Sequence, residues 1–316
     1  MAADQLQEFI SKPARSLACY ADFHFEDKLI RLPIETEYGE VIEATFCYGY
    51  QREKWLAALS TQVGCPSKCK FCELGENGLK RNLTSEEIVD QLRIALNRAY
   101  SRGYDIFDRP IKATFVMGGE PLTNPYFPEA IGRMKEESPL QLKISTILPS
   151  TQLAENTYRE VLDNVKGYPN IIQFQISLNS TDEAYRQSLS AIPLASFKDV
   201  RKAGEMWFQN IPNPRKVDLT FTVNSDTPMD PYAIKDVLPT ELFAIRLRDM
   251  LPTRRGLANG LKIAEKRHVE EIWKKFEDAG YQIIPGSPGG VERRFKLAPG
   301  ETLNMYSCIR NQEAVA

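Results

Sequence analysis

The sequence has few cysteines and histidines and no long apolar run, and each shortage excludes a class of protein. Six cysteines in 316 residues, unevenly spread, are too few for a disulfide-stapled secreted domain. Two histidines, His24 and His268, leave little scope for Cys/His metal sites. No window reaches the length of about 20 apolar residues that spans a membrane, and the N-terminus lacks the apolar segment of a signal peptide. We therefore expect a cytoplasmic protein without a membrane partner.

The charge balance is close to neutral, and this argues against a partner that is bound through many negative charges, such as nucleic acid. Forty basic against 42 acidic residues give a net charge of −2 at pH 7. Proteins that hold nucleic acid through many phosphate contacts carry an excess of positive charge. The composition, 42% hydrophobic and 26% charged, is that of a globular protein large enough to fold without a disulfide or metal.

Short apolar segments alternate with helical segments along most of the chain. Strands are predicted at 57–63, 111–117, 141–147, 171–178, 216–223 and 242–248, and helices at about 84–100, 126–136, 151–164, 182–189, 197–209, 231–237 and 264–279. This alternation is typical of βα units with parallel strands, while 29–34 and 42–49 predict a hairpin before them. Periodicity leaves both a doubly wound sheet and a partial barrel open. In either fold, ligands bind at the carboxyl ends of the strands.

Three of the cysteines fall close together, directly after the first strand of the alternating series. Cys65, Cys69 and Cys72 are separated by three and then two residues. Thiolates are the soft ligands that iron–sulfur clusters select, and three of them leave one iron of a four-iron cluster open for another ligand. A structural zinc site usually shows a second cysteine pair, which the sequence lacks. A zinc-binding interaction module, with its fourth ligand elsewhere, is the alternative of another class.

This loop, with Phe71 just before the third cysteine, resembles the radical S-adenosylmethionine (SAM) superfamily. A second match is the Met-Gly-Gly-Glu-Pro segment at 117–121, where that superfamily carries an element that grips the SAM amino group. The resemblance implies an α/β fold, a partial (β/α)6 TIM-like barrel with a small N-terminal β-hairpin extension. It also implies a [4Fe–4S] cluster on Cys65, Cys69 and Cys72. SAM on the open iron is then cleaved by an injected electron to methionine and a 5′-deoxyadenosyl radical.

The same resemblance assigns residues to the SAM site. It implies that Glu120 accepts hydrogen bonds from the SAM ammonium, and that Gly118 and Gly119 permit close backbone approach. Two serines at the ends of the next two strands are expected to line the pocket. The residues assigned to cofactor binding are Gly118, Gly119, Glu120, Ser145, Ser177 and Asn179.

A longer match is to the adenine-methylating radical SAM enzymes that act on ribosomal and transfer RNA. Segments 60–65 and 78–84 and the Gly-Glu-Pro-Leu-x-Asn run at 119–124 carry it, and it covers about residues 28–308. Cys308 lies where that family carries a cysteine that is methylated during turnover. The resemblance implies that Cys308 takes a methyl group, which the radical activates for addition to an sp² carbon of the substrate.

The chain departs from that family at several places. The segment before the hairpin is too short for the family's helical RNA-binding domain, and Ala58 stands where the family has its second catalytic cysteine. Asn179 replaces a histidine, and Cys19 and Cys47 are interpreted as structural. These departures and the near-neutral charge favour a small-molecule or nucleotide-like substrate over a large folded RNA.

The alternative enzyme hypothesis is direct hydrogen abstraction from a small phosphorylated or carboxylated metabolite. Arginines at 246–255 and 293–294 would then bind its anionic group, because guanidinium suits bidentate contacts. Either enzyme needs a reducing partner such as flavodoxin or ferredoxin. We expect three parts: an N-terminal segment with the hairpin (1–50), the barrel (51–285), and a tail over the barrel mouth (286–316).

Overall fold

The centre of the molecule is a curved sheet whose parallel strands follow the order β5-β8-β9-β10-β11-β12-β13. The computed structural model describes residues 2–25, 29–48, 53–138, 140–168, 170, 172–212, 214–285, 300, 303 and 306. The parallel strands are β5 (Trp55–Leu59), β8 (Ile111–Phe115), β9 (Gln141–Thr146), β10 (Ile172–Ser177), β11 (Val217–Val223), β12 (Phe243–Asp249) and β13 (Gln282–Pro285). This arrangement confirms the predicted α/β fold with a parallel sheet. Within the described strands β13 pairs only with β12, so the sheet does not close into a full barrel.

Antiparallel strands extend this sheet on the β5 side. The predicted hairpin is confirmed as β3 (Leu29–Thr36) and β4 (Val41–Tyr48), with two short strands, β1 (Leu17–Ala18) and β2 (Phe23–Phe25), along β3. β4 pairs with β5, so the hairpin and the parallel strands form one sheet. The division of the chain at residue 50 stays a prediction.

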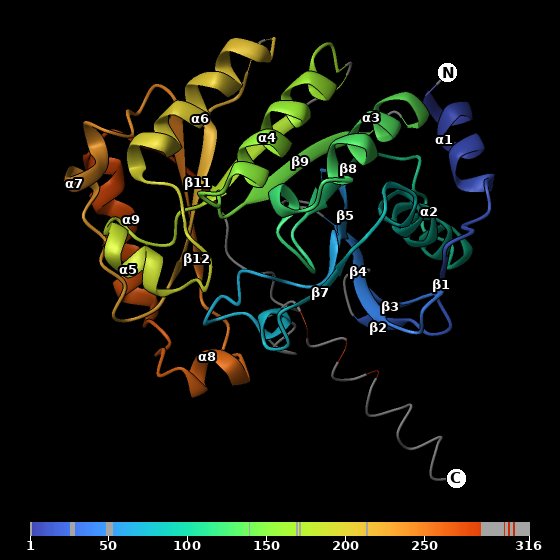
Figure 1. The fold of residues 1–316 in the computed structure, drawn as a ribbon, viewed down its shortest axis with the longest axis horizontal. Helices are drawn as coiled ribbons and strands as arrows, with labels where there is room; N and C mark the ends of the chain where they lie inside the picture. The colour runs from blue at the N-terminus through green and yellow to red at the C-terminus, as the bar shows by residue number, and fades with distance from the viewer. Residues whose placement is uncertain are drawn as a thin grey trace.

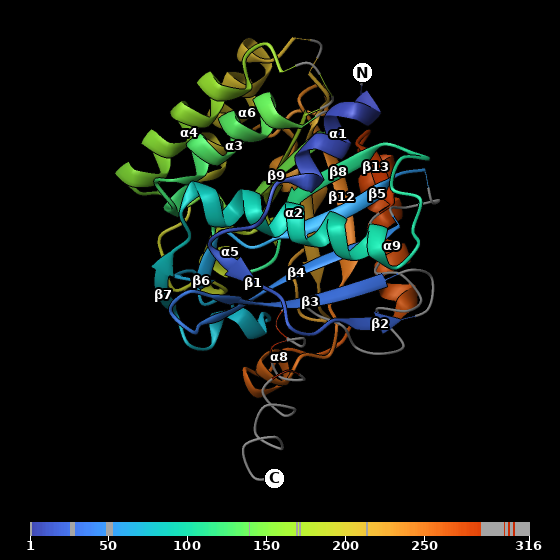
Figure 2. The same ribbon diagram turned by 90° about the vertical axis from the view of Figure 1, so that its right-hand side faces the viewer.

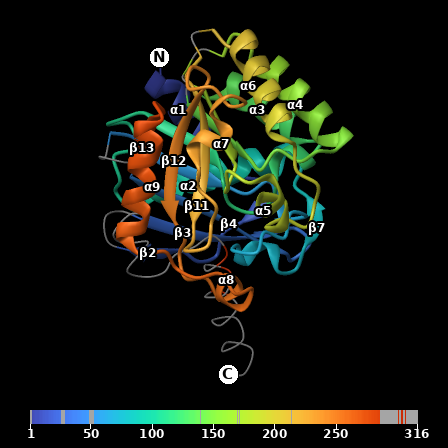
Figure 3. The ribbon, with the colours of Figure 1, turned by 90° about the vertical axis from the view of Figure 1, so that its left-hand side faces the viewer.

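Helices cover the outer side of the sheet, as Figures 1 and 2 show for α2, α3, α4 and α6. The helices are α1 (Ala2–Ser11), α2 (Ser85–Ser101), α3 (Phe127–Glu137), α4 (Gln152–Val165), α5 (Glu183–Ser188), α6 (Phe197–Asn210), α7 (Pro231–Lys235), α8 (Arg254–Ala258) and α9 (Lys266–Asp278). α9 lies beside β12 and β13 (Figure 3). The capping box predicted at the start of α2 is present, with Glu87 N donating to Thr84 Oγ1 and Thr84 N to the Glu87 carboxylate. None of the helices in the described part of the chain is long and apolar enough to span a membrane.

The two faces of the parallel sheet differ in chemistry because side chains alternate along each strand. On the outer face Phe174 of β10 stacks against Tyr158 of α4 and Trp207 of α6, with ring centroids 5.1 and 5.0 Å away. The residues between such apolar positions point to the inner, concave face, and nearly all are polar. On β8 to β12 these are Lys112, Thr114, Gln141, Lys143, Ser145, Gln173, Gln175, Ser177, Asp218, Thr220, Thr222, Ala244, Arg246 and Arg248. The inner face is therefore suited to a polar ligand.

The structure differs from the expected strand at 57–63. β5 ends at Leu59, and residues Gln62–Gly64 form a separate strand, β6, which pairs with β7 (Leu79–Asn82). The break occurs because Ser60 N donates to Gln91 Oε1 and Thr61 N donates to Gly118 O, at 2.9 and 2.6 Å. This turn directs the chain away from the sheet and into the cysteine loop.

Truncation of Trp207 tests the packing of the outer face. Trp207→Ala is expected to lower the free energy of unfolding by about 3–5 kcal/mol, because a large, fully buried ring is lost and leaves a cavity. Urea unfolding measures the loss. The matched control, Trp273→Ala, removes a half-buried tryptophan of α9 and should cost clearly less. Equal losses for the two variants would contradict this account of the core.

Candidate functional site

The cysteine loop begins at a glycine that no other residue can replace. Gly64 has φ +77°, and a Cβ at this position would lie 1.9 Å from Gly78 O. The next residue, Cys65, donates its backbone N–H to the same carbonyl at 3.0 Å. The loop is therefore closed against the start of β7, at the carboxyl end of β5.

The thiols of the three loop cysteines lie close enough to influence one another. Burial raises the pKa of Cys65, Cys69 and Cys72, to about 12 for Cys72. Charge repulsion among the three thiols adds to the rise for Cys69 and Cys72. Backbone N–H groups also bond to these sulfurs, from Leu74 and Gly75 to Cys72 for example. Such donors support thiolate ligands of iron–sulfur clusters, so the residues present fit that cofactor. No group of three His, Cys, Asp or Glu side chains in the described ranges is arranged to hold a single metal ion.

A short segment after the last predicted strand holds the loop by its carbonyl oxygens. Thr253 Oγ1 donates to Phe71 O at 2.9 Å, and Asn259 Nδ2 donates to Lys70 O at 3.0 Å. Arg255 donates from Nε to Cys69 O at 3.2 Å and from Nη2 to Lys68 O at 3.0 Å. Four successive carbonyls of the loop, 68–71, are thus fixed by residues 253–259.

Residues from two other parts of the chain, after α5 and at position 300, also contact the loop or the turn that follows it. Lys70 N donates to Leu189 O at 3.0 Å, just after α5. Gly300 has φ +99°, and a Cβ there would lie 2.7 Å from Glu73 Cβ in the turn after Cys72. Gly300 N also donates to Glu43 Oε1 at 2.6 Å. The chain at residue 300 therefore passes directly beside the cysteine loop.

The Gly-Gly-Glu-Pro turn packs against the connection between β5 and β6. Gly118 O accepts hydrogen bonds from Thr61 N and Gln62 N, at 2.6 and 3.1 Å. Gly119 has φ +104°, and a Cβ there would lie 2.6 Å from Thr61 Oγ1. The close approach that these glycines permit in the structure is to the chain's own backbone. Their contact with SAM stays a prediction.

Glu120, the carboxylate of this turn, is buried and positioned by three donors. Oε1 accepts from Leu122 N at 3.1 Å and from Thr146 Oγ1 at 2.5 Å, and Oε2 accepts from Ile147 N at 2.9 Å. Burial raises the pKa of Glu120 from 4.5 to about 7, and these hydrogen bonds oppose the rise. From the described residues Oε2 accepts one hydrogen bond, which leaves it a lone pair for an ammonium group.

The other residues predicted to bind the cofactor lie on or beside the inner face. Ser145 is buried on β9, and its Oγ has no hydrogen-bond partner among the described residues. Ser177 ends β10 and is half-buried. Asn179 has φ +61°, and its Oδ1 accepts from Thr222 N at 3.1 Å, so it joins the ends of β10 and β11. The two serines thus lie near the carboxyl ends of β9 and β10, and their contact with SAM stays a prediction.

Of the other cysteines, the two that the structure describes, Cys19 and Cys47, lie outside the loop. Ala58, at the position of the family's second cysteine, lies on the inner face of β5 opposite Thr114. Cys47 pairs with Leu56 in the neighbouring strand and packs against Leu29 in a small apolar cluster. Cys19 is half-buried and donates its thiol to Ala21 O at 3.0 Å, outside the barrel interior. Cys308 lies outside the described residues, as do Arg293 and Arg294.

The sequence did not predict the role of residues 253–259. Arg254 and Arg255 were expected to bind a substrate anion, but Arg255 holds the cysteine loop and Arg254 forms ion pairs with Glu73 and Glu76. Thr253 caps α8 by accepting from Gly256 N, and this Thr-x-x-Gly cap was the available sequence signal. A five-residue helix has no apolar periodicity that would predict it.

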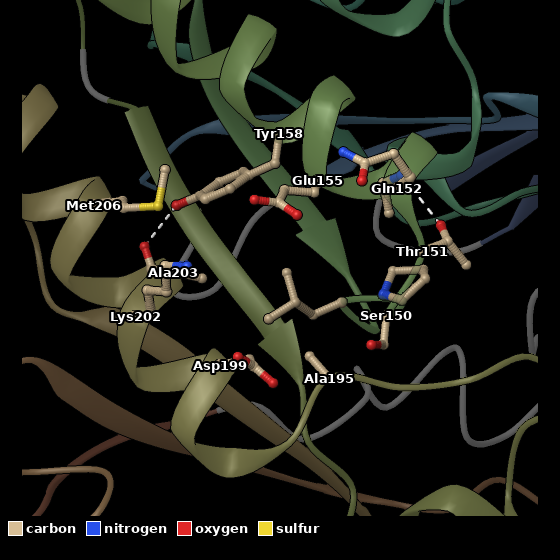
Figure 4. A pocket seen from close by; sticks show the side chains of 13 residues that line it. Ser150, Thr151, Gln152, Glu155, Tyr158, Ala195, Asp199, Lys202, Ala203 and Met206 are labelled. Carbon is tan, nitrogen blue, oxygen red and sulfur yellow. Dashed lines mark hydrogen bonds between the residues drawn. The ribbon is translucent and has the colours of Figure 1, made fainter.

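A cavity of about 290 Å³ lies outside the barrel, between α4 and α6. Figure 4 shows Glu155, Asp199 and Lys202 around it, with Tyr158 OH donating to Ala203 O at 2.7 Å. None of the predicted cofactor or cluster residues lines it, so it is separate from the cysteine loop.

Comparison with known proteins identifies the class to which this fold and loop belong. A family model described as the radical SAM superfamily matches residues 59–237, more than half of the chain. The chain belongs to the radical SAM superfamily. That superfamily uses a [4Fe–4S] cluster and SAM, so the predicted cofactors are confirmed at the level of the family.

Particular relatives share a methyltransferase name. "Probable RNA methyltransferase" of Sorangium cellulosum is 26% identical over 88% of this chain and 67% of its own length. "Dual-specificity RNA methyltransferase RlmN" of Marinobacter nauticus is 30% identical over 54% of the chain and 45% of its own length. The chain thus spans less than half of that second relative. A crystal structure of a radical SAM methyltransferase from Sphaerobacter thermophilus, 19% identical, superposes with a TM-score of 0.72 over 95% of this chain and 85% of that one. This likeness shows the shared fold.

The hydrogen bonds from Arg255 can be tested without any cofactor. Arg255→Ala removes two bonds to loop carbonyls, each worth about 1 kcal/mol, so amide hydrogen exchange in residues 65–75 is expected to accelerate about 30-fold. Exchange followed by mass spectrometry measures this. The control variant Arg267→Ala removes an exposed arginine of α9 that pairs with Glu271 and should leave loop exchange unchanged. Unchanged exchange in Arg255→Ala would contradict the role of residues 253–259.

Proposed function

We propose that this radical SAM protein is a methyltransferase that modifies an sp² carbon of a nucleotide-like or small-molecule substrate. The observation that carries the proposal is the convergence of three thiols and the buried Glu120 carboxylate at the carboxyl ends of the strands. Burial contributes most to the raised pKa values of Cys65 and Cys69, and the charge of Glu120 is near enough to raise both further. Cluster ligands and SAM-binding carboxylate therefore share one small region.

In this proposal Cys65, Cys69 and Cys72 hold the cluster, which supplies the electron that cleaves SAM when both are bound. Glu120 binds the SAM ammonium through Oε2, while Thr146 and Ile147 fix its orientation. Ser145 and Ser177 line the same pocket, together with Asn179. Residues 253–259 keep the loop rigid by binding the carbonyl oxygens of residues 68–71.

Cys308 is the proposed methyl carrier. Its thiolate takes a methyl group from one SAM, and the 5′-deoxyadenosyl radical from a second SAM removes a hydrogen atom from that methyl. The resulting carbon radical would add to the sp² carbon of the substrate. The methylated product would be released once that carbon loses its proton, one electron returns to the cluster, and an external thiol cleaves the bond between the Cys308 sulfur and the methylene as a disulfide, with a proton completing the methyl group. Two described neighbours support the position: Gly300 lies against the cysteine loop, and Tyr306 is 8% exposed.

Ala58 favours a second candidate, direct hydrogen abstraction from the substrate. Ala58 faces inward beside Thr114, and a methyl side chain cannot remove a proton from a methylated substrate carbon. In this candidate the deoxyadenosyl radical abstracts hydrogen from a small phosphorylated or carboxylated metabolite. Both candidates require a reductant, such as flavodoxin or ferredoxin.

The substrate proposed for this chain is smaller than the RNA that the names of its relatives indicate. Those relatives are named as RNA methyltransferases, which supports a nucleobase as the group that is modified. The net charge of −2 opposes extensive contact with the phosphates of a large folded RNA. A nucleotide-like substrate reconciles the two observations.

The cluster ligands are tested by cysteine substitution. After anaerobic reconstitution, Cys69→Ala is expected to lose most bound iron and sulfide, because three thiolates are needed to hold the cluster. Cys19→Ala and Cys47→Ala are the matched controls and should reconstitute like the unaltered protein. Iron, sulfide and zinc analysis provides the measurement. Normal iron and sulfide in a Cys65/Cys69/Cys72 triple variant, or stoichiometric zinc in the unaltered protein, would refute the assignment.

The role of Glu120 predicts a pH dependence of SAM binding. Since burial holds the carboxyl pKa near 7 in the free protein, the group is protonated below that pH, whereas a bound ammonium requires its ionised form. SAM affinity is therefore expected to rise with pH through about 7, up to about pH 8, where the α-ammonium of SAM itself loses its proton. Glu120→Gln should bind SAM about 30-fold or more weakly, with no such dependence. Calorimetry between about pH 6 and 8.5 measures both, and an identical profile in the variant would exclude the role.

Methylation of Cys308 distinguishes the two candidates. Protein isolated from cells with active SAM metabolism is expected to carry about 14 Da of added mass on Cys308, the mass of one methyl substitution. Peptide mass spectrometry locates the mark, and Cys19 in the same digest serves as the unmodified control. Normal turnover of substrate by Cys308→Ala would exclude methyl transfer through this residue and favour direct hydrogen abstraction.

A further inference from the structure

The inner face of the sheet carries more basic than acidic side chains. These residues lie well away from the cysteine loop in sequence. Lys112 lies near the start of β8 and is 5% exposed. The side chain of Lys143 on β9 is 15% exposed, and that of Arg246 on β12 is 18% exposed. Among the inner-face residues of β8 to β12, Asp218 is the one acidic side chain.

One carboxylate, that of Asp218, is shared by two of these basic groups, Arg246 and Lys143. Asp218 Oδ2 accepts from Arg246 Nη2 at 2.9 Å and from Gln173 Nε2 at 2.7 Å, and it lies 3.8 Å from Lys143 Nζ. Lys112 Nζ donates to Gln173 Oε1 at 2.7 Å, a neutral acceptor. Asp218 therefore hydrogen-bonds to Arg246 and forms a longer ion pair with Lys143, while Lys112 has no carboxylate within hydrogen-bonding distance in the described part of the chain.

Buried ammonium groups without a close counter-ion are costly to maintain. Burial, and after it the nearby charge of Lys54, lower the pKa of Lys112 to about 8. Burial also lowers the pKa of Lys143 well below its usual range, with Arg246 as the next contributor. An anion between the two lysines would remove this penalty.

A hydroxyl group on the same face also has an unmet hydrogen bond. Thr220 lies two residues beyond Asp218 on β11, so both side chains point to the inner side. Thr220 is 3% exposed, and its Oγ1 has no hydrogen-bond partner among the residues that the structure describes. A buried hydroxyl without a partner is uncommon and calls for a ligand or an ordered water. Two ammonium groups and a hydroxyl donor suit the oxygens of a phosphate.

We propose that this inner face binds the phosphate monoester of a small substrate, with Lys112 and Lys143 supplying charge and Thr220 donating a hydrogen bond. The burial of Lys112 suits a terminal phosphate better than an internal phosphodiester, which carries chain on both sides. Lys143 also lies three residues before Thr146, whose hydroxyl holds Glu120, so β9 links this position to the SAM site. The assignment of the phosphate to the substrate rests on the proposed function.

Phosphate binding is measured on the full-length protein with its cluster reconstituted. Calorimetry with inorganic phosphate, and with ribose 5-phosphate against ribose, is expected to show binding of the two phosphates and none of ribose. Lys143→Met should bind phosphate at least 10-fold more weakly, and the isosteric Thr220→Val several-fold more weakly. Lys166→Met, which alters an exposed lysine paired with Asp163, is the matched control and should bind like the unaltered protein. Iron content and melting temperature, measured on each variant, show that cluster and fold are retained.

Four results would overturn the proposal. These are no phosphate binding at millimolar concentration, unchanged affinity in both Lys143→Met and Thr220→Val, equal affinity for acetate, and competition between phosphate and SAM. Competition would assign the lysines to the SAM carboxylate instead. Because phosphate binding is measured without turnover, its failure leaves cluster assembly and Cys308 methylation separately testable.

Discussion

The hydrogen bonds between residues 253–259 and the carbonyls of 68–71 are the constraint on which the site depends. They join parts of the chain 182 to 189 residues apart, so the cysteine loop takes its shape only when the sheet has formed as far as β12. Each bond contributes about 0.5–1.5 kcal/mol, and together they hold the loop backbone while leaving its thiols turned toward one another. Folding of the barrel and assembly of the ligand set are therefore coupled.

The alternation of side chains along the parallel strands separates stability from function. Stacked aromatic rings such as Phe174 and Trp207 pack under the outer helices and stabilise the sheet. The inner positions of the same strands carry lysine, arginine, serine and threonine, which contribute little to packing and place polar groups where a ligand can meet them. The buried charge of Lys112 and Lys143 is a cost that the apolar outer face offsets.

The sequence predicted those features that depend on local pattern and spacing. The hairpin, the order of strands and helices, the Thr84 cap and the clustering of Cys65, Cys69 and Cys72 follow from alternation, capping chemistry and close spacing. The role of Arg255 could not be predicted, because it depends on contacts with residues far away in the chain. The prediction of one continuous strand over 57–63 was wrong for a related reason. Gln91 and Gly118, both distant in sequence, form the hydrogen bonds that end β5 at Leu59. The excess of basic residues on the inner face could not be predicted, because only the register of the paired strands shows which residues share that face.

The central claim is that the cysteine loop holds a cluster whose open iron meets SAM beside Glu120. Electron paramagnetic resonance of the anaerobically reconstituted, reduced protein, recorded with and without SAM, tests it most directly. The account predicts the spectrum of a reduced [4Fe–4S] cluster, with a change in its g values when SAM is added, and no such change in Glu120→Gln at the same SAM concentration. A protein without a reducible cluster, or a cluster spectrum that SAM leaves unaltered in the unsubstituted protein, would contradict it.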